Sequence, residues 1–124
     1  MESKELNTAM TKIQNKLIVT LNSDLVEQNF KLISDTIVNA VEEYKVSGVV
    51  IDFSVIKVMS SYTYKIFKNL TRAIIIMGID VVWVGLNPGV IVSLMDLNLI
   101  EDACKIKAGF NVEQGLKMLS TKER

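Results

Sequence analysis

Hydrophobic residues recur along the chain with two different spacings, and these spacings alternate. Short runs rich in β-branched residues predict strands, whereas apolar positions three and four residues apart predict helices. Strands are predicted at residues 10–13, 16–21, 49–52, 81–84 and 103–107, and helices near residues 25–45, 61–77, 88–97 and 111–119. Strands that alternate with helices indicate parallel neighbours, and the first two strands predict an antiparallel hairpin. We therefore expect one α/β domain with a mixed, mostly parallel sheet and helices packed against it.

Each predicted helix has one apolar face that suits burial against a sheet. The apolar positions are Val26, Phe30, Ile33, Ile37, Val41 and Tyr44 in the first helix, and Thr63, Ile66, Phe67, Leu70, Ile74 and Met77 in the second. They are Ile91, Leu94 and Leu97 in the third helix, and Val112, Leu116 and Leu119 in the last. Tyr62, Ile75 and Ile76 fall outside the face of the second helix. They either broaden its buried face or form a surface that meets another protein.

The predicted elements begin and end at residues that suit those positions. We expect Gln14 and Asn15 to form the hairpin turn, and Gly78 to end the second helix. The predicted helix caps are residues 22–24 with Glu27, Ser60, Asn87 followed by Pro88, and Asn111 with Gln114. Met59 and Tyr64 occupy the two positions of a hydrophobic staple around Ser60.

Composition excludes several classes of function. The 124 residues include 14 Lys or Arg and 14 Asp or Glu, so the formal net charge is zero and a nucleic-acid partner is not expected. There is no His and only one Cys, Cys104, which excludes a Cys–His zinc site and a disulfide within the chain. We therefore expect a protein that is not an enzyme, with no catalytic residue, metal or cofactor. The single Cys and the absence of a signal peptide or membrane-spanning run favour the cytoplasm.

Three features suggest chemistry but have simpler explanations. Asp52 ends a buried strand, as the phosphate-accepting Asp of receiver domains does, yet residues 22–24 lack the acidic pair that would hold Mg²⁺. We interpret Asp52 as a hydrogen-bond acceptor that organises a loop. Cys104 has no His to activate it, so it is expected to be a packed or half-exposed strand residue. Residues 85–89 lack the Gly spacing and the Lys of a phosphate-binding loop, and a helix cap followed by proline accounts for them.

Residues 60–64 are five consecutive hydroxyl residues at a predicted helix start. A helix cap explains one serine of the pair Ser60 and Ser61. A hydroxyl at this position could also carry a phosphate, because free backbone N–H groups and the positive end of the helix dipole stabilise an anion. Capping is the simpler explanation on these grounds, and composition does not separate the two.

Three segments of the chain resemble successive signature stretches of STAS domains. They are residues 48–53 (GVVIDF), 58–61 (VMSS) and 78–88 (GIDVVWVGLNP), and the ending at residues 111–116 (NVEQGL) also resembles that of the small stressosome subunits. The resemblance runs from about residue 10 to residue 119. It identifies the chain as similar to anti-sigma-factor antagonists with a STAS domain, and most of all to the small stressosome subunits of the RsbS type. On this basis we expect a flexible N-terminus at residues 1–8, a STAS domain at residues 9–119 and a tail at residues 120–124.

The resemblance implies a phospho-switch without catalytic activity. In this family a serine at the start of the second helix is phosphorylated by a serine/threonine kinase with a histidine-kinase-like ATP fold, and Ser61 is the matching residue. Family members usually have Asp before that serine. Here Ser60 stands in its place and is the alternative acceptor. We expect Asp52, Tyr62 and Asn87 to support the loop or to contact a partner.

The resemblance also implies partners. A small stressosome subunit co-assembles with larger STAS-containing paralogues, and this scaffold sequesters the kinase until phosphorylation releases it in bacterial stress signalling. One alternative is a stand-alone antagonist that binds an anti-sigma factor directly, and another is a STAS module that binds a small ligand in a polar-lined cavity. A transporter module is disfavoured by the lack of membrane spans. We expect self-association or a large mixed assembly, with no nucleic acid and no membrane.

Overall fold

The computed structural model describes residues 8–21, 30–103 and 105–122. Its strands are β1 (Thr8–Ile13), β2 (Lys16–Leu21), β3 (Gly48–Asp52), β4 (Asp80–Val84) and β5 (Ala108–Gly109). Its helices are α2 (Phe30–Tyr44), α3 (Ser61–Ile76), α4 (Pro88–Asp96), α5 (Ile100–Ala103) and α6 (Val112–Lys122). Three predictions from the sequence lie outside the described residues. They concern the helix cap at residues 22–24 with Glu27, the apolar position Val26, and Cys104.

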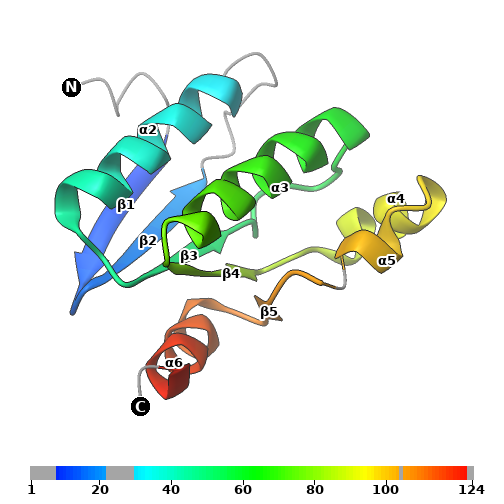
Figure 1. Cartoon of the computed structure of the whole chain (residues 1–124). Helices are drawn as coiled ribbons and strands as arrows, with labels where there is room; N and C mark the ends of the chain where they lie inside the picture. Colours follow the sequence, from blue (N-terminus) through cyan, green and yellow to red (C-terminus); the bar gives the residue numbers. More distant parts are fainter. Residues whose placement is uncertain (1–7, 22–29, 104, 123–124) are drawn as a thin grey trace.

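The five strands form one sheet in which their spatial order is their order along the chain. β1 and β2 are antiparallel, while β2, β3, β4 and β5 run parallel to one another. At the predicted hairpin turn, Gln14 and Asn15 have positive φ angles of 51° and 82°, which is the backbone of a two-residue primed turn. Figure 1 shows α2 and α3 on one face of the sheet and α6 on the other. The predicted mixed sheet with helices packed against it is confirmed.

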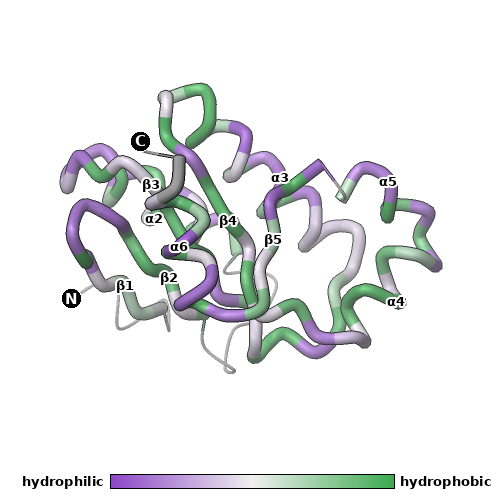
Figure 2. The backbone as a smooth tube through the Cα atoms, turned by 90° about the horizontal axis from the view of Figure 1, so that it is seen from below, coloured by the Kyte–Doolittle hydropathy of each residue, from purple (hydrophilic) through white to green (hydrophobic). Residues whose placement is uncertain are grey.

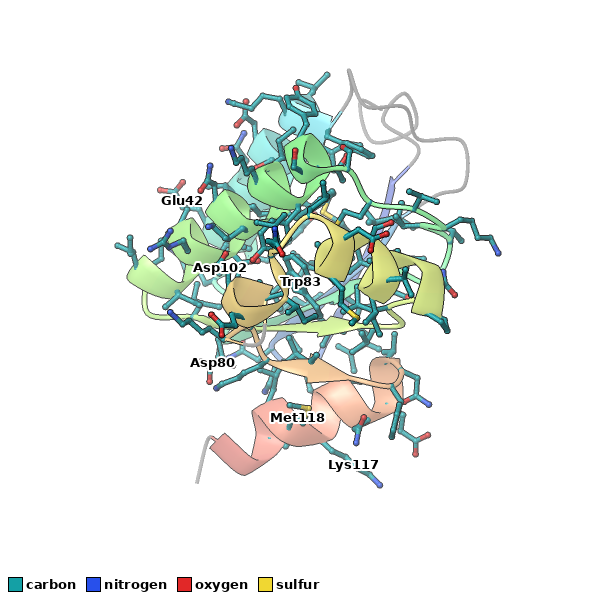
Figure 3. The ribbon with its side chains drawn as sticks, turned by 90° about the vertical axis from the view of Figure 1, so that its right-hand side faces the viewer. Glu42, Asp80, Trp83, Asp102, Lys117 and Met118 are labelled. Atoms are coloured by element: carbon teal, nitrogen blue, oxygen red, sulfur yellow. The ribbon has the colours of Figure 1, made fainter. Side chains whose placement is uncertain are left out.

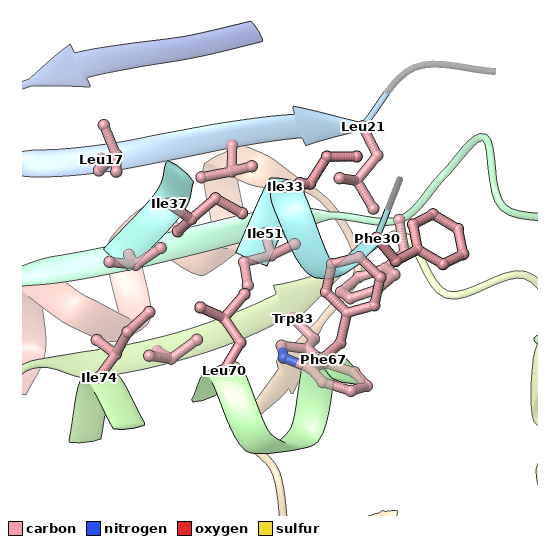
Figure 4. Close-up of a cluster of buried hydrophobic side chains, with 14 of the residues drawn as sticks. Leu17, Leu21, Phe30, Ile33, Ile37, Ile51, Phe67, Leu70, Ile74 and Trp83 are labelled. Atoms are coloured by element: carbon pink, nitrogen blue, oxygen red, sulfur yellow. The ribbon is translucent and has the colours of Figure 1, made fainter. Parts of the chain in front are cut away.

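The larger core fills the space between the sheet and the pair α2 and α3. Figure 4 shows inward-pointing side chains from β2, β3, β4 and both helices. They include Leu17, Leu21, Ile51 and Trp83 from the strands, and Phe30, Ile33, Ile37, Phe67, Leu70 and Ile74 from the helices. The Trp83 Nε1–H donates to Thr71 Oγ1 at 2.9 Å, and Thr71 in turn donates to the Phe67 carbonyl at 2.8 Å. These bonds satisfy the polar atoms that are buried with the indole ring.

A second core lies between the other face of the sheet and α6. Ile18, Val50, Val82, Val84 and Leu119 form it, so β3 and β4 are buried on both faces, as their unbroken apolar runs predict. The hydrophobic colour of β4 in Figure 2 reflects this run. Helix α6 lies close to the sheet at Gly115, where an added Cβ would stand 2.9 Å from Val84 Cγ1. The helix continues to Lys122 and does not end at residue 119 as predicted.

The strand predicted at residues 103–107 is wrong. Residues 100–103 form the short helix α5, and the last strand, β5, is confined to Ala108–Gly109. Only the end of the predicted segment pairs with the sheet, where the Lys107 carbonyl accepts the Trp83 N–H at 2.9 Å. Ile100 and Ala103 both pack against the larger core. They are one helical turn apart, so a helix rather than a strand brings both to the same side.

Some predicted apolar positions are exposed instead. In α4, Val90 and Leu94 are the buried residues, while Ile91 and Leu97 are exposed. This helix is apolar on most sides, so its spacing does not identify the inward face. Tyr44 and Met77, at the ends of α2 and α3, are also exposed.

The C-terminus of α3 follows the prediction. Gly78 has a φ of 88°, its N–H donates to the Ile75 carbonyl, and the Ile79 N–H donates to the Ile74 carbonyl. This pair of bonds is a Schellman motif, in which glycine takes the left-handed position after the helix.

Candidate functional site at the N-terminus of α3

Ser60 is the N-cap of α3, as predicted. Its Oγ accepts the Thr63 N–H at 3.2 Å and also donates to Thr63 Oγ1, at 3.2 Å. Its carbonyl accepts the Tyr64 N–H at 2.9 Å. Met59 and Tyr64, the predicted staple residues, are both buried in the larger core. The start of α3 is therefore fixed by hydrogen bonds on one side and by apolar packing on the other.

Ser61, the first residue of α3, has a different environment. Its side chain is exposed and makes no hydrogen bond to any other residue that the structure describes. Tyr62 is also exposed, whereas Thr63 and Tyr64 are buried, so the five hydroxyl residues separate into outward-facing and inward-facing groups. The N–H groups of Ser61 and Tyr62 lie in the first turn, where the helix supplies no acceptor. No acidic residue stands in this turn. The site therefore presents a free hydroxyl beside backbone donors.

Asp52 and Asn87 hold the loop that leads from β3 to α3. Asp52 Oδ1 accepts the Ser54 N–H at 3.0 Å. Asn87 Nδ2 donates to the carbonyls of Ser54 at 2.9 Å and Ile56 at 2.7 Å. Asn87 is the N-cap residue of α4, but its side chain makes no capping bond. The predicted capping role of this side chain is therefore wrong, because the amide is used to fix the neighbouring loop.

Two glycines allow this loop to approach the β4–α4 segment closely. A Cβ on Gly85, whose φ is 76°, would stand 2.8 Å from Asp52 Oδ1, and a Cβ on Gly89 would stand 2.9 Å from the Lys57 carbonyl oxygen. Gly85 and Gly89 therefore help to support the loop before Ser61, a role that the sequence analysis gave to Asn87 but missed for these glycines. The available signal was the pair of glycines that flank Asn87 and Pro88.

Tyr64 links α3 to α5 through a contact that the sequence analysis also missed. Its OH donates to Asp102 Oδ2 at 2.6 Å, and Lys68 Nζ lies 2.9 Å from the same oxygen. Figure 3 shows Asp102 between the two helices. Burial, reinforced by the Asp102 carboxylate, raises the pKa of Tyr64. The bonds from Tyr64 and then Lys68 lower the pKa of Asp102. Tyr64 therefore stays neutral and structural, and it is no candidate for an acid or a base.

The described parts of the chain contain no group of three or more His, Cys, Asp or Glu side chains that could hold a metal ion. Within the same residues, no helix is both long and apolar enough to cross a bilayer. What the site offers chemically is an exposed hydroxyl that could accept a group from another protein.

The family model of the STAS domain matches residues 7–110. Among solved structures, a serine-to-glutamate variant of RsbS from Moorella thermoacetica is 20% identical and superposes with a TM-score of 0.82. The match covers 94% of this chain and 97% of that one. No curated protein matches this chain.

Two further structures share the fold. A chain in a structure of the molecular architecture of the stressosome is 22% identical, with a TM-score of 0.80 over 94% of this chain and 99% of that one. The anti-sigma factor antagonist SpoIIAA in its unphosphorylated form is 12% identical, with a TM-score of 0.71 over 92% and 96%. At these identities the likeness concerns the fold alone.

Proposed function

Since the chain belongs to the STAS domain family, we propose that it is a regulatory phospho-switch without catalytic activity, in which Ser61 accepts a phosphate from a serine kinase. Its fold is that of the anti-sigma-factor antagonists and the small stressosome subunits. The observation that carries the proposal is the exposed Ser61 hydroxyl, the first side chain of α3, which has no hydrogen-bond partner in the described parts of the chain.

The contacts of the two serines favour Ser61 over Ser60 as the acceptor. Ser60 Oγ is already engaged with the N–H and the hydroxyl of Thr63. Phosphorylation there would remove the proton that Ser60 donates to Thr63, and it would disturb a cap that stabilises the helix by about 1 kcal/mol. Phosphorylation of Ser61 breaks no such bond.

The helix start can accept the added charge without unfolding. A phosphate adds roughly −1.5 to −2 charges near neutral pH, and a helix N-terminus stabilises an anion by about 0.3–1 kcal/mol. Lys65 is exposed and stands one turn after Ser61 on the same side of α3. Phosphorylation therefore changes the surface that a partner meets rather than the domain itself.

In our proposal the partners are larger STAS-containing paralogues and the kinase that they hold. The exposed ring of Tyr62 stands beside Ser61 and gives an apolar contact to a partner. Asp52 and Asn87 fix the preceding loop, so that this surface is formed before binding. A phosphate placed against a partner's apolar or acidic surface weakens the contact, and the kinase is released.

Phosphorylation with the host's own kinase tests the acceptor assignment. The kinase is recovered by pull-down with the full chain and incubated with labelled ATP and each variant. Ser61→Ala should lose the label. Ser60→Asp should keep the label, which is then at Ser61. Asp retains a capping oxygen and restores the residue usual in the family, and it has no hydroxyl that could itself accept the phosphate. Ser61→Ala labelled as fully as the wild type would show that the assignment is wrong. An anti-sigma factor in the pull-down, with no STAS paralogue, would favour the stand-alone antagonist.

A further inference from the structure

A cavity of about 240 Å³ lies between α3 and the segment that contains α5. Its polar lining is formed by Lys68, Thr71, Arg72, Asp102 and Lys105, and Ile106 contributes to its apolar wall. The α3 residues that line it come seven or more positions after Ser61, the first residue of that helix. The cavity is therefore separate from the proposed phosphorylation site.

Positive charge exceeds negative charge in this lining. Three of the residues are cationic, and Asp102 is the one carboxylate. Asp102 Oδ2 already receives Lys68 Nζ at 2.9 Å and the Tyr64 OH at 2.6 Å. The side chains of Arg72 and Lys105 make no ion pair or hydrogen bond with another residue in the described ranges. Two cations therefore remain uncompensated at this cavity, although the whole chain has a formal net charge of zero.

We propose that this cavity binds a small phosphate-bearing ligand, held between Arg72 and Lys105. The guanidinium group presents paired N–H donors that match two phosphate oxygens, and the ammonium group adds a compact charge. Both charges lie close enough to be felt at the cavity wall. The Arg72 charge opposes the rise in the pKa of Tyr64 that burial and Asp102 cause, and the Lys105 charge adds to the lowering of the pKa of Asp102 by Tyr64 and Lys68. Thr71 Oγ1 is already used by Trp83 and Phe67, so recognition rests on the cations.

The dimensions of the cavity favour a small ligand. Pockets for drug-sized ligands span about 300–1,000 Å³. A volume of about 240 Å³ suits inorganic phosphate or a short phosphate ester rather than a nucleotide. Such a ligand would bridge α3 and the segment that follows α5, in addition to the Asp102 contacts that already join α3 to α5. This function goes beyond the proposed switch, and it does not depend on Ser61.

Calorimetric titration of the full chain tests the proposal. The probes are inorganic phosphate, glycerol phosphate and the dicarboxylate malonate, at constant ionic strength so that general screening is unchanged. We expect saturable binding of one or both phosphate compounds, with malonate weaker. Glycerol phosphate binding more tightly than inorganic phosphate would identify an ester as the ligand, and the reverse order would identify free phosphate. Arg72→Gln and Lys105→Gln should each weaken binding about tenfold or more, the effect of losing a charged hydrogen bond.

Lys12→Gln is the matched control, because Lys12 is exposed on β1 and its replacement changes the net charge equally. It should bind like the wild type. Ser61→Ala should also bind normally, so a failure of the switch and a failure of this site are distinguishable. The absence of saturable heat with every probe would overturn the proposal. An equal loss of affinity in Lys12→Gln would also overturn it, since binding would then reflect overall charge.

Discussion

Ser60 and Ser61 are neighbours with the same side chain, yet the start of α3 gives them different environments. Ser60 faces the first turn and bonds to Thr63, whereas the Ser61 hydroxyl is exposed to solvent. The cap at Ser60 could be predicted from local sequence, because capping depends on residues within one turn. The loop contacts of Asn87 could not, because they join residues that are far apart along the chain.

This difference predicts unequal effects on stability. Ser60→Ala should lower the free energy of unfolding by about 1 kcal/mol, because the Thr63 N–H loses its acceptor. Ser61→Ala should change it by less than about 0.5 kcal/mol, as is usual for an exposed side chain without partners. Urea denaturation of the two variants and of Ser60→Asp measures this. An equal decrease in the free energy of unfolding in Ser60→Ala and Ser61→Ala would contradict the assignment of Ser60 as the cap.

At the scale of elements, the central strands were predictable and the last strand was not. Strands β3 and β4 are continuous apolar runs buried on both faces, so their sequence and their environment agree. Residues 103–107 also look strand-like, but the packing of Ile100 and Ala103 against the core favours a helix before β5. The alternating spacings of apolar residues identified the order of elements better than their boundaries, and the match to residues 7–110 confirms the family resemblance.

The approach of α6 to the sheet gives a prediction at the same scale. In a helix, Gly→Ala usually stabilises by about 1 kcal/mol. Gly115→Ala should instead destabilise the domain by about 1–3 kcal/mol, because the new Cβ would meet Val84 Cγ1 at 2.9 Å in a buried layer. Thermal unfolding of Gly115→Ala, measured in the wild type and in a Val84→Ala background, separates the gain in helix propensity from the cost of the steric contact. The penalty should be clearly smaller in the second background, where Val50 Cγ1 at 3.3 Å becomes the nearest atom. A penalty of the same size in both backgrounds would show that the contact with Val84 is not its cause.

At the scale of the whole molecule, the surface combines zero formal net charge with exposed apolar side chains. Both features favour association. Ile75, Ile76 and Met77 are consecutive and exposed at the end of α3, and Ile76 is 84% exposed. Tyr62, Ile75 and Ile76 are all exposed, so they do not broaden the buried face of the helix, which was one of the two interpretations of the sequence. The remaining interpretation is a surface that meets another protein, and we propose that this protein contains another STAS domain.

A charge at Ile76 tests this surface. We expect the wild-type chain to associate with itself or with a STAS-containing paralogue, and Ile76→Lys to weaken that association, because burying an unpaired ammonium group in an apolar contact is costly. The fold should be retained, since a side chain that is 84% exposed contributes little to the core.

Leu32→Lys is the control: Leu32 is exposed on α2 beside the ion pair of Lys31 and Asp35, and the change in charge is the same. Sedimentation velocity, with the chain alone and mixed with the paralogue, measures the outcome. A wild-type chain that stays monomeric in both experiments, or an Ile76→Lys variant that associates as well as the wild type, would contradict the role of this surface.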